Sequence, residues 1–239
     1  MTKLLYQTDA YLKEFSAIIT SVDVETRAVI LDQSAFYPGG GGQPCDFGSL
    51  DVAGVIYPVE KVKKQGDDVL HFLGGTQPLP APNSVSFGTL DWVRRYQLMR
   101  THTALHILCG TVFRDYGAKV TGGDMEPLKG RMDFEFENMR AELVKAIETA
   151  TNFEVQQRRE IKVRILPRDE AFQIPDLIRT KINLLPEGIM QVRTVEIVGL
   201  DLQADGGTHV MNTSEIGTIK VVDYKSKGAI NKRIYIEVE

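Results

Sequence analysis

The sequence predicts an α+β protein with two parts. The first is a small N-terminal antiparallel β-barrel, and the second is a C-terminal α+β domain whose helices pack on a mixed or antiparallel sheet. Three observations support this: short β-like runs fill residues 1–90, a Pro/Gly-rich connector lies at 74–85, and helical periodicity begins at residue 92. The predicted domains are therefore residues 1–90 and 91–239.

The N-terminal part consists of short apolar runs separated by turn residues. Residues 17–34 predict two strands with a turn at Val24–Thr26, and residues 55–73 predict two more with a turn at Gln65–Asp68. A further strand is predicted over residues 84–91. Short antiparallel strands at regular spacing are typical of a small barrel.

The C-terminal part begins with a helix that is expected to end at Gly117. Its apolar side chains recur at helical spacing, at Leu98, Ala104, Leu105, Leu108, Val112 and Phe113. A second, amphipathic helix is predicted over 138–160, with Asn138 as its candidate N-cap. The remaining apolar runs predict strands at 130–137, 162–166, 192–198, 217–224 and 233–238.

The composition limits the class of protein. With 43% hydrophobic and 25% charged residues, the 239-residue chain can bury a core. No apolar run approaches the roughly 18 residues of a membrane-spanning helix, and charges interrupt the N-terminal apolar stretch, so neither a membrane partner nor a secretory signal is expected. Two cysteines, Cys45 and Cys109, cannot form a disulfide framework, and a cytoplasmic location fits.

Three of the four histidines fall in two short motifs. His102 and His106 are four residues apart on a predicted helix, so both imidazoles lie on one face. His209 ends a Gly-rich turn that begins at Asp205, and Gly206–Gly207 allow that turn to bend tightly. This set of donors predicts a split divalent-metal site, with His102 and His106 as ligands from the helix and one or two ligands, His209 and Asp205, from the loop. No Glu follows His102, so the pattern is not that of a zinc protease.

Two segments closely resemble the editing domain of alanyl-tRNA synthetase and its freestanding relatives, the AlaX proteins. They are RTHTALHIL at 100–108 and ADGGTHVMNTSEIG at 204–217. FYPGGGGQPCDFG at 36–48 resembles the Gly-rich motif that precedes this domain in the longer AlaX forms. Similar family segments are DWVRRYQLMR at 91–100 and KGAINKRI at 227–234. The resemblance runs from about residue 30 to the C-terminus, and 239 residues leave no room for an aminoacylation domain.

The resemblance implies an aminoacyl-tRNA deacylase, a metal-dependent ester hydrolase that acts in trans. Its substrate would be the acceptor end of mischarged tRNA(Ala), carrying chiefly serine and also glycine, and its cofactor one Zn²⁺ per chain. The family usually has Cys where Asp205 stands here. A carboxylate can bind zinc, although it lowers selectivity for zinc over other divalent ions. Alternatively, Asp205 does not bind the metal and water fills the fourth position.

Cys109 is a second conceivable sulfur ligand. It lies seven residues after His102 on the same helical face, which corresponds to about 10 Å along a helix. One ion cannot bridge that distance unless the helix breaks. We therefore expect Cys109 to be a buried core residue.

Several polar residues near the motifs are candidates for substrate binding. Thr103, Gln203 and Thr208 could recognise a serine hydroxyl, whereas synthetase editing domains often carry Thr at the position of Leu105. The alternation of Asp201, Gln203 and Asp205 places them on one face of an extended segment, where Asp201 or Gln203 could contact the histidines.

The glycine run at residues 39–42 lacks the Lys-Ser/Thr of a P-loop, so no ATP binding is expected. The resemblance implies instead that Gly40, Gly41 and Gly42 reach the pocket of the second domain and influence substrate choice. By itself the run also fits a flexible hairpin turn.

The net charge of −4 disfavours non-specific nucleic-acid binding but permits a local basic patch. Arg94, Arg95 and Arg100 precede the metal-binding motif and are candidates for RNA binding. Two alternative functions stay open. One is a deacylase for another mischarged tRNA, such as Ser-tRNA(Thr). The other is a catalytically silent, metal-stabilised tRNA-binding module. This alternative stays open because Asp205 replaces the usual Cys of the family.

Overall fold

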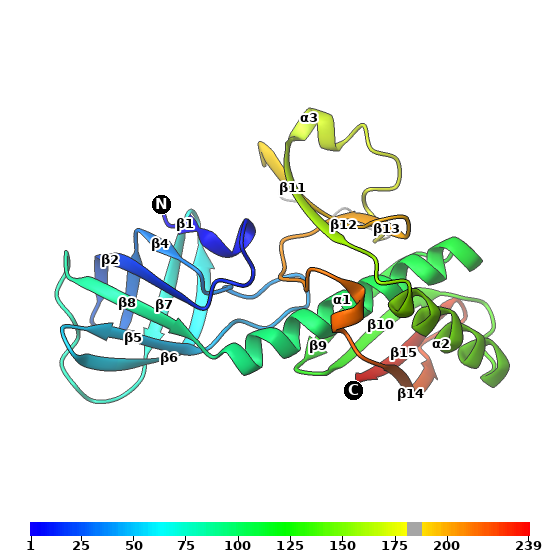
Figure 1. The fold of residues 1–239 in the computed structure, drawn as a ribbon, viewed down its shortest axis with the longest axis horizontal. Helices are drawn as coiled ribbons and strands as arrows, with labels where there is room; N and C mark the ends of the chain where they lie inside the picture. The colour runs from blue at the N-terminus through cyan, green and yellow to red at the C-terminus, as the bar shows by residue number, and fades with distance from the viewer. Residues whose placement is uncertain (181–187) are drawn as a thin grey trace. The chain divides into compact units, whose positions relative to one another are not determined.

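The protein is described here from a computed structural model, which defines residues 1–180 and 188–239 (Figure 1). The chain divides into two compact units, Met1–Tyr96 and Gln97–Glu239. The boundary falls within the long helix α1 (Trp92–Tyr116).

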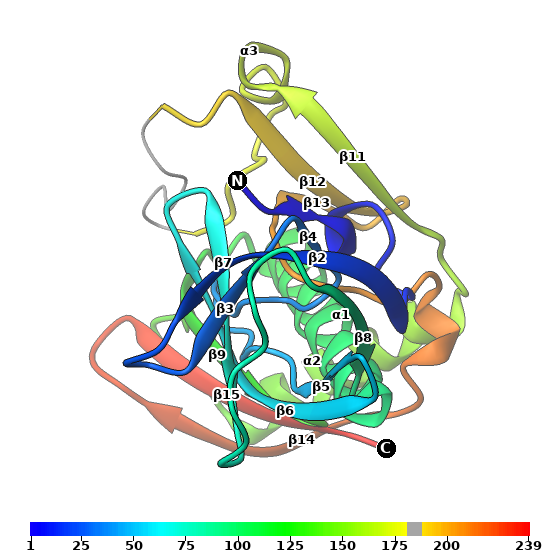
Figure 2. The same ribbon diagram turned by 90° about the vertical axis from the view of Figure 1, so that its left-hand side faces the viewer.

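The first unit contains a closed six-stranded antiparallel barrel in the order β2-β3-β7-β6-β5-β8 (Figure 2). Its strands are β2 (Glu14–Asp23), β3 (Ala28–Leu31), β5 (Gly48–Val52), β6 (Val55–Gln65), β7 (Asp68–Leu73) and β8 (Val85–Leu90). A short parallel pair, β1 (Lys3–Leu4) and β4 (Gln33–Ser34), flanks the turn of 3-10 helix at Leu5–Gln7. The predicted barrel and its two strand pairs are confirmed, whereas the short strand β5 was not predicted from the sequence.

Strict alternation of side chains builds the barrel interior. Along β2, Phe15, Ala17 and Ile19 are buried while their neighbours Ser16 and Ile18 are partly or fully exposed. Burial of apolar side chains on one face of every strand provides the main stabilisation of such a barrel, at about 25 cal/mol per Å² of apolar surface.

A histidine also lies inside the barrel. His71 is fully buried, with its Nε2 2.8 Å from Ser34 Oγ and its Nδ1 3.3 Å from the carbonyl oxygen of Val29. Its ring contacts the edge of Phe36 at a centroid distance of 5.5 Å. Burial lowers the pKa of His71 to about 4, so the imidazole is neutral near pH 7.

The glycine run forms a loop with an unusual backbone. Gly39, Gly40, Gly41 and Gly42 all have left-handed φ angles, between +57° and +135°. An L side chain would be strained at each position, so the loop itself requires four glycines. The loop is closed by hydrogen bonds of 2.9–3.0 Å between the backbones of Gly40 and Gln43.

A buried ion pair joins the segment after this loop to the start of α1. Arg95 is fully buried and donates from Nε to both carboxylate oxygens of Asp46 at 3.0 Å. Its remaining nitrogens donate to the carbonyl oxygens of Ala35 at 2.6 Å and Ala10 at 3.0 Å. The structure thereby corrects the expectation that Arg95 contacts RNA, because none of its guanidinium surface is exposed.

The described residues of the second unit form two antiparallel sheets and two principal helices (Figure 1). The four-stranded sheet has the order β14 (Ile219–Ser226), β15 (Asn231–Val238), β10 (Lys129–Glu135) and β9 (Val120–Glu126). The three-stranded sheet has the order β11 (Ile161–Pro167), β12 (Gln191–Ile197) and β13 (Asp201–Ala204). The other elements are α2 (Ala141–Gln156), the single turn α3 (Arg168–Ala171) and the 3-10 turn η2 (Thr213–Glu215). The predicted α+β class is confirmed, and β9 and β13 are strands that the sequence did not indicate.

Helix α1 is buried on all sides from Thr101 to Val112, not only along the predicted stripe. The reason is that it packs against both sheets. A Cβ at Gly130 of β10 would lie 3.0 Å from Leu105, and one at Gly110 of α1 would lie 2.9 Å from the Cβ of Asp201 in β13. Gly110, in the middle of the helix, is thus explained by the close approach of β13 rather than by its flexibility.

Helix α2 begins later than predicted. Its N-cap is Arg140, without a side-chain cap hydrogen bond, so the expectation that Asn138 caps it is wrong. The helix is held instead by tertiary contacts, because Asn152 forms two hydrogen bonds with the backbone of Ile219 at 2.7 and 3.0 Å. No described helix is long and apolar enough to cross a membrane.

The buried imidazole of His71 makes stability depend on pH. Its pKa is about 4 in the folded protein but about 6.5 in an unfolded chain, so between these values the unfolded state binds more protons. The contribution of His71 is fully present above pH 6.5 and is lost as the pH falls toward 4, at up to about 1.4 kcal/mol per pH unit. Urea unfolding should therefore show a weaker pH dependence for His71→Gln than for the parent chain. An equal pH dependence in both proteins would contradict this assignment.

Candidate metal centre

Four side chains from distant parts of the sequence converge in the second unit. They are His102 and His106 of α1, Asp205 just after β13, and His209 in the following loop. One ligand atom from each lies within 4.8 Å of all the others. The three histidines are 3–7% exposed, and the side chain of Asp205 is 13% exposed. The cluster could therefore hold a metal ion, and the helix–loop division predicted from the sequence is the one observed.

The three-stranded sheet places Asp205 in this cluster. Residues Asp201 and Gln203 pair with Ile197 and Val195 of β12, and the N–H of Asp205 donates to the carbonyl oxygen of Arg193 at 3.0 Å. Alternate residues of a strand project to one face, so Asp201, Gln203 and Asp205 all face the same side, as their spacing predicts.

The side chain of Asp205 stabilises the turn in the loop that follows β13. Asp205 Oδ2 accepts a hydrogen bond of 2.8 Å from the N–H of Gly207. Neither Gly206 nor Gly207 has a left-handed φ, so the expectation that these glycines bend the loop through special backbone angles is wrong. Aspartate commonly closes such turns through the backbone N–H two residues later.

In two of the three histidines, Nδ1 lies close to an oxygen atom of another side chain. The hydroxyl of Thr103 donates to the carbonyl oxygen of Met99 at 2.9 Å, so its oxygen accepts from His209 Nδ1 at 3.1 Å. Asp201 Oδ2 lies 3.3 Å from His106 Nδ1. We infer from this network that Nδ1 carries the proton in both residues, which leaves Nε2 of each free for a metal.

The Nε2 atoms of two histidines face the carboxylate of Asp205. His209 Nε2 lies 3.0 Å from Oδ2, and His102 Nε2 lies 3.6 Å from Oδ1. With Nδ1 of His209 protonated, two electron-rich atoms face each other at hydrogen-bond distance. A bound cation resolves this repulsion, which is why the set of donors fits a metal.

The protonation states also suit a metal. Burial lowers the pKa of His209 to about 4 and holds the pKa of His102 well below its ordinary value. Burial alone would raise the pKa of Asp205, but the surrounding imidazoles hold it well below its usual range. Burial likewise lowers the pKa of His106, but the contact with Asp201 and the negative charge of Asp205 together outweigh this effect and raise it. Near pH 7 the cluster therefore contains a carboxylate and at least two neutral imidazoles.

Arg193 belongs to the site and was not singled out from the sequence. It is 8% exposed, its Nη1 donates to the carbonyl oxygen of Asp205 at 2.9 Å, and the same nitrogen lies 3.7 Å from Asp205 Oδ2. Its positive charge stabilises the carboxylate that the histidines surround. The sequence shows only an Arg within a strand, and the register with β13 reveals its role.

A second arginine lies behind His106. The guanidinium of Arg179 stacks 3.8 Å from the ring centre of Phe113, and its Nε lies 3.5 Å from Asp201 Oδ1. Asp201 thus lies between an arginine and a histidine, which restricts its orientation.

The candidate substrate residues differ in their surroundings. Thr103 is buried and is occupied by His209, Met99 and the N–H of Val210, so it orients a histidine. Gln203 donates from Nε2 to Asp201 at 2.6 Å and to Cys109 Sγ at 3.4 Å, and Thr208 is fully buried.

Cys109 lies outside the cluster of metal-binding atoms, and burial raises the pKa of its thiol. Its expected role as a buried core residue is consistent with this environment.

The remaining predicted residues lie away from the cluster or make other contacts. Gly40, Gly41 and Gly42 belong to the first unit, and their influence on a substrate stays a prediction. Arg94 donates to the carbonyl oxygen of Cys45 at 3.2–3.3 Å. Arg100 donates to the carbonyl oxygens of Ile216 and Glu239. These two arginines are less free to bind RNA than their sequence position suggests.

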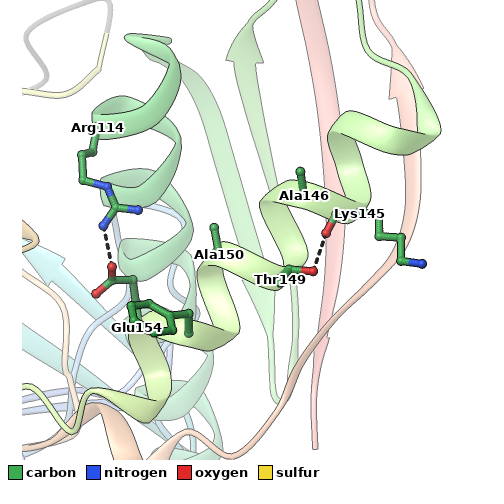
Figure 3. A pocket seen from close by; sticks show the side chains of 7 residues that line it. Arg114, Lys145, Ala146, Thr149, Ala150 and Glu154 are labelled. Atoms are coloured by element: carbon green, nitrogen blue, oxygen red, sulfur yellow. Dashed lines mark hydrogen bonds and ion pairs between the residues drawn. The ribbon is translucent and has the colours of Figure 1, made fainter.

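A groove of about 700 Å³ lies elsewhere, between α1 and α2 (Figure 3). Its mainly apolar surface includes Phe153, and at one end Arg114 pairs with Glu154. No residue of the metal cluster lines it, so it offers no catalytic group of this centre.

Comparison with known proteins relates the chain to tRNA synthetases and to editing proteins. The family described as "Threonyl and Alanyl tRNA synthetase second additional domain" matches residues 192–235, and that described as "tRNA synthetases class II (A)" matches residues 5–86. The chain is 41% identical over 241 residues to "Alanyl-tRNA editing protein AlaX-M" of Saccharolobus solfataricus, covering 100% of both chains. It is 35% identical to the AlaX-M protein of Methanosarcina barkeri, covering 98% of both. It is also 37% identical over 227 residues to "Alanine--tRNA ligase" of Ignicoccus hospitalis, which is 92% of this chain and 24% of that enzyme.

The geometry predicts how single substitutions change metal binding. His106→Ala should abolish stoichiometric zinc binding, because it removes one of four convergent donors. Asp201→Asn should weaken binding about 10–100-fold, because the amide fixes His106 less firmly. Asp205→Ala should also weaken binding, whereas Asp205→Cys should retain zinc and bind it more selectively. Equilibrium dialysis with elemental analysis measures each effect.

His71→Gln, which removes the histidine of the barrel, is the matched control and should keep full metal content. A His106→Ala protein with undiminished zinc would refute the site. An Asp205→Ala protein that holds zinc as tightly as the parent would show that Asp205 is not a ligand.

Proposed function

The chain belongs to the AlaX-M family of alanyl-tRNA editing proteins, and from that premise we propose that it deacylates mischarged Ser-tRNA(Ala) in trans. Gly-tRNA(Ala) is the second proposed substrate. The observation that supports this most directly is the buried cluster of His102, His106, Asp205 and His209, with donors suited to one divalent ion per chain. Zinc is the proposed ion, because it accepts histidine and carboxylate ligands in a tetrahedral site.

The metal supplies Lewis acidity toward the ester when it is bound. Other residues of the chain hold the metal-binding side chains in position. Thr103 and Asp201 hold two of the imidazoles by their outer nitrogens, and Arg193 holds the carboxylate. A set of donors held in this way needs little rearrangement on binding substrate, and an aminoacyl ester is labile enough that orientation supplies much of the rate.

Rejection of alanine follows from unpaired polar groups. A pocket that hydrogen-bonds the serine hydroxyl leaves its own polar groups unsatisfied when alanine binds, and this costs binding energy. Gln203 and Thr208 are the proposed groups, because both belong to the segment that carries Asp205 and His209. Thr103 is a weaker candidate, since its hydroxyl is already fully used.

The glycine loop is the proposed second determinant of substrate choice. A Cβ at Gly41 would meet no atom within 4 Å, and one at Gly40 would meet only the Tyr37 hydroxyl at 3.6 Å. The left-handed backbone, and not crowding, therefore requires glycine at these two positions. The carbonyl oxygen of Gly40 already accepts hydrogen bonds from the N–H of Gln43 and the hydroxyl of Tyr37. Gly41 is exposed and Gly42 is half-buried, so the backbone of these two residues is the proposed contact for a small amino-acid moiety.

Deacylation of separately charged tRNAs tests the proposed function. The parent chain should hydrolyse Ser-tRNA(Ala) and Gly-tRNA(Ala) faster than Ala-tRNA(Ala), and a chelator should abolish the activity. Faster hydrolysis of Ser-tRNA(Thr) would assign the chain to another tRNA. Binding of tRNA without hydrolysis of any ester would identify a silent binding module.

Substitution of the glycine loop tests its role separately. Gly40→Ala together with Gly41→Ala strains two left-handed positions, so hydrolysis of Ser-tRNA(Ala) should slow or rejection of Ala-tRNA(Ala) should weaken, with unchanged metal content. Gly54→Ala, at another left-handed turn of the barrel, is the control for general strain. A folded double variant with unaltered rates and discrimination would show that the loop is only a turn.

A further inference from the structure

The face of the three-stranded sheet that carries Asp205 continues to an exposed edge. Asp205 is bonded to Arg193 of β12, and Arg193 pairs directly with Ile165 of β11. Directly paired residues of neighbouring strands project to the same face. Ile165 therefore lies on the face of the metal cluster, two strand spacings or about 10 Å from Asp205.

A parallel row leads to a second apolar residue. Gln203 pairs with Val195, and Val195 pairs with Val163 of β11. Val195 is fully buried, whereas Val163 and Ile165 are 40% and 39% exposed. Figure 2 shows β11 at one edge of this sheet. The two exposed side chains of this strand therefore form a small apolar wall on the face of the metal cluster.

We propose that Val163 and Ile165 form the wall against which the base of the terminal nucleoside of the tRNA packs. This inference rests on the proposed function. The ester joins the amino acid to the ribose of that nucleoside, so when the ester lies at the metal cluster the base lies one ribose away. The wall lies on the same face of the sheet as the metal cluster and a short distance from it, with Arg193 between the wall and Asp205.

The charge on the face of the wall favours RNA over an apolar peptide. Arg193 pairs with Ile165, so its guanidinium lies on the same face, between the wall and Asp205. Arg164 belongs to the same edge strand and is exposed, but it projects from the opposite face. A cation beside an apolar wall suits a nucleotide, whose base is apolar on its faces and whose phosphate is negative.

Two stable probes isolate the contribution of the base. One is 3′-(L-seryl)amino-3′-deoxyadenosine, in which an amide replaces the labile ester, and the other is the same serylamide on a ribose that lacks the base. Calorimetry on the zinc-loaded full-length chain gives both dissociation constants. The parent should bind the adenosine probe more tightly.

Val163→Ser together with Ile165→Ser should weaken binding of the adenosine probe about tenfold, the value expected for losing contact with two aliphatic side chains. Binding of the probe without the base and the zinc content should stay unchanged. Ile230→Ser, a comparably exposed aliphatic position between β14 and β15, should change neither constant.

The outcomes separate this inference from the proposed function. If the parent deacylates Ser-tRNA(Ala) but the double variant keeps the full preference for the adenosine probe, the wall is elsewhere and the function stands. If the parent binds neither probe and hydrolyses no charged tRNA, the proposed function and the base wall both fail.

Discussion

The charged carboxylate of Asp205, which is largely enclosed by three imidazoles, is the constraint on which the second unit depends. Such a charge is unfavourable in a protein interior unless several partners compensate for it. Here the compensation comes from Arg193, from the N–H of Gly207 and from the cation that the donors fit. Each partner belongs to a different segment, so the charge can be buried only when strand, loop and helix are assembled together.

Helix α1 meets this requirement through its two close contacts. Leu105 packs on Gly130 of one sheet, and Gly110 lets the other sheet approach until Asp201 reaches His106. A larger residue at position 110 would force the helix and β13 apart and move the histidines away from Asp205. Packing density and metal geometry are therefore coupled, and a core substitution far from any ligand atom would change the centre.

Aspartate at position 205 gives this centre a different balance from one with cysteine. A carboxylate oxygen is a harder ligand than a thiolate, so a site with aspartate is less selective for zinc than a site with cysteine. Arg193 partly offsets the negative charge of the carboxylate, so an ion held by this cluster would be more electron-poor. The aspartate also stabilises the turn, because its carboxylate accepts a hydrogen bond from the N–H of Gly207. A cysteine side chain is a weaker acceptor for this bond.

The sequence by itself determined the fold class, the barrel pairs around residues 24–26 and 65–68, the long helix and the shared face of Asp201, Gln203 and Asp205. These features follow from local periodicity and turn chemistry, which a few neighbouring residues decide. The tertiary structure alone decided that Arg95 is an internal ion-pair partner of Asp46, that Thr103 orients His209, and that Arg193 stabilises Asp205. The first two roles depend on contacts between residues that are 49 and 106 positions apart in the sequence, and the third depends on strand register. No local sequence pattern encodes either of these.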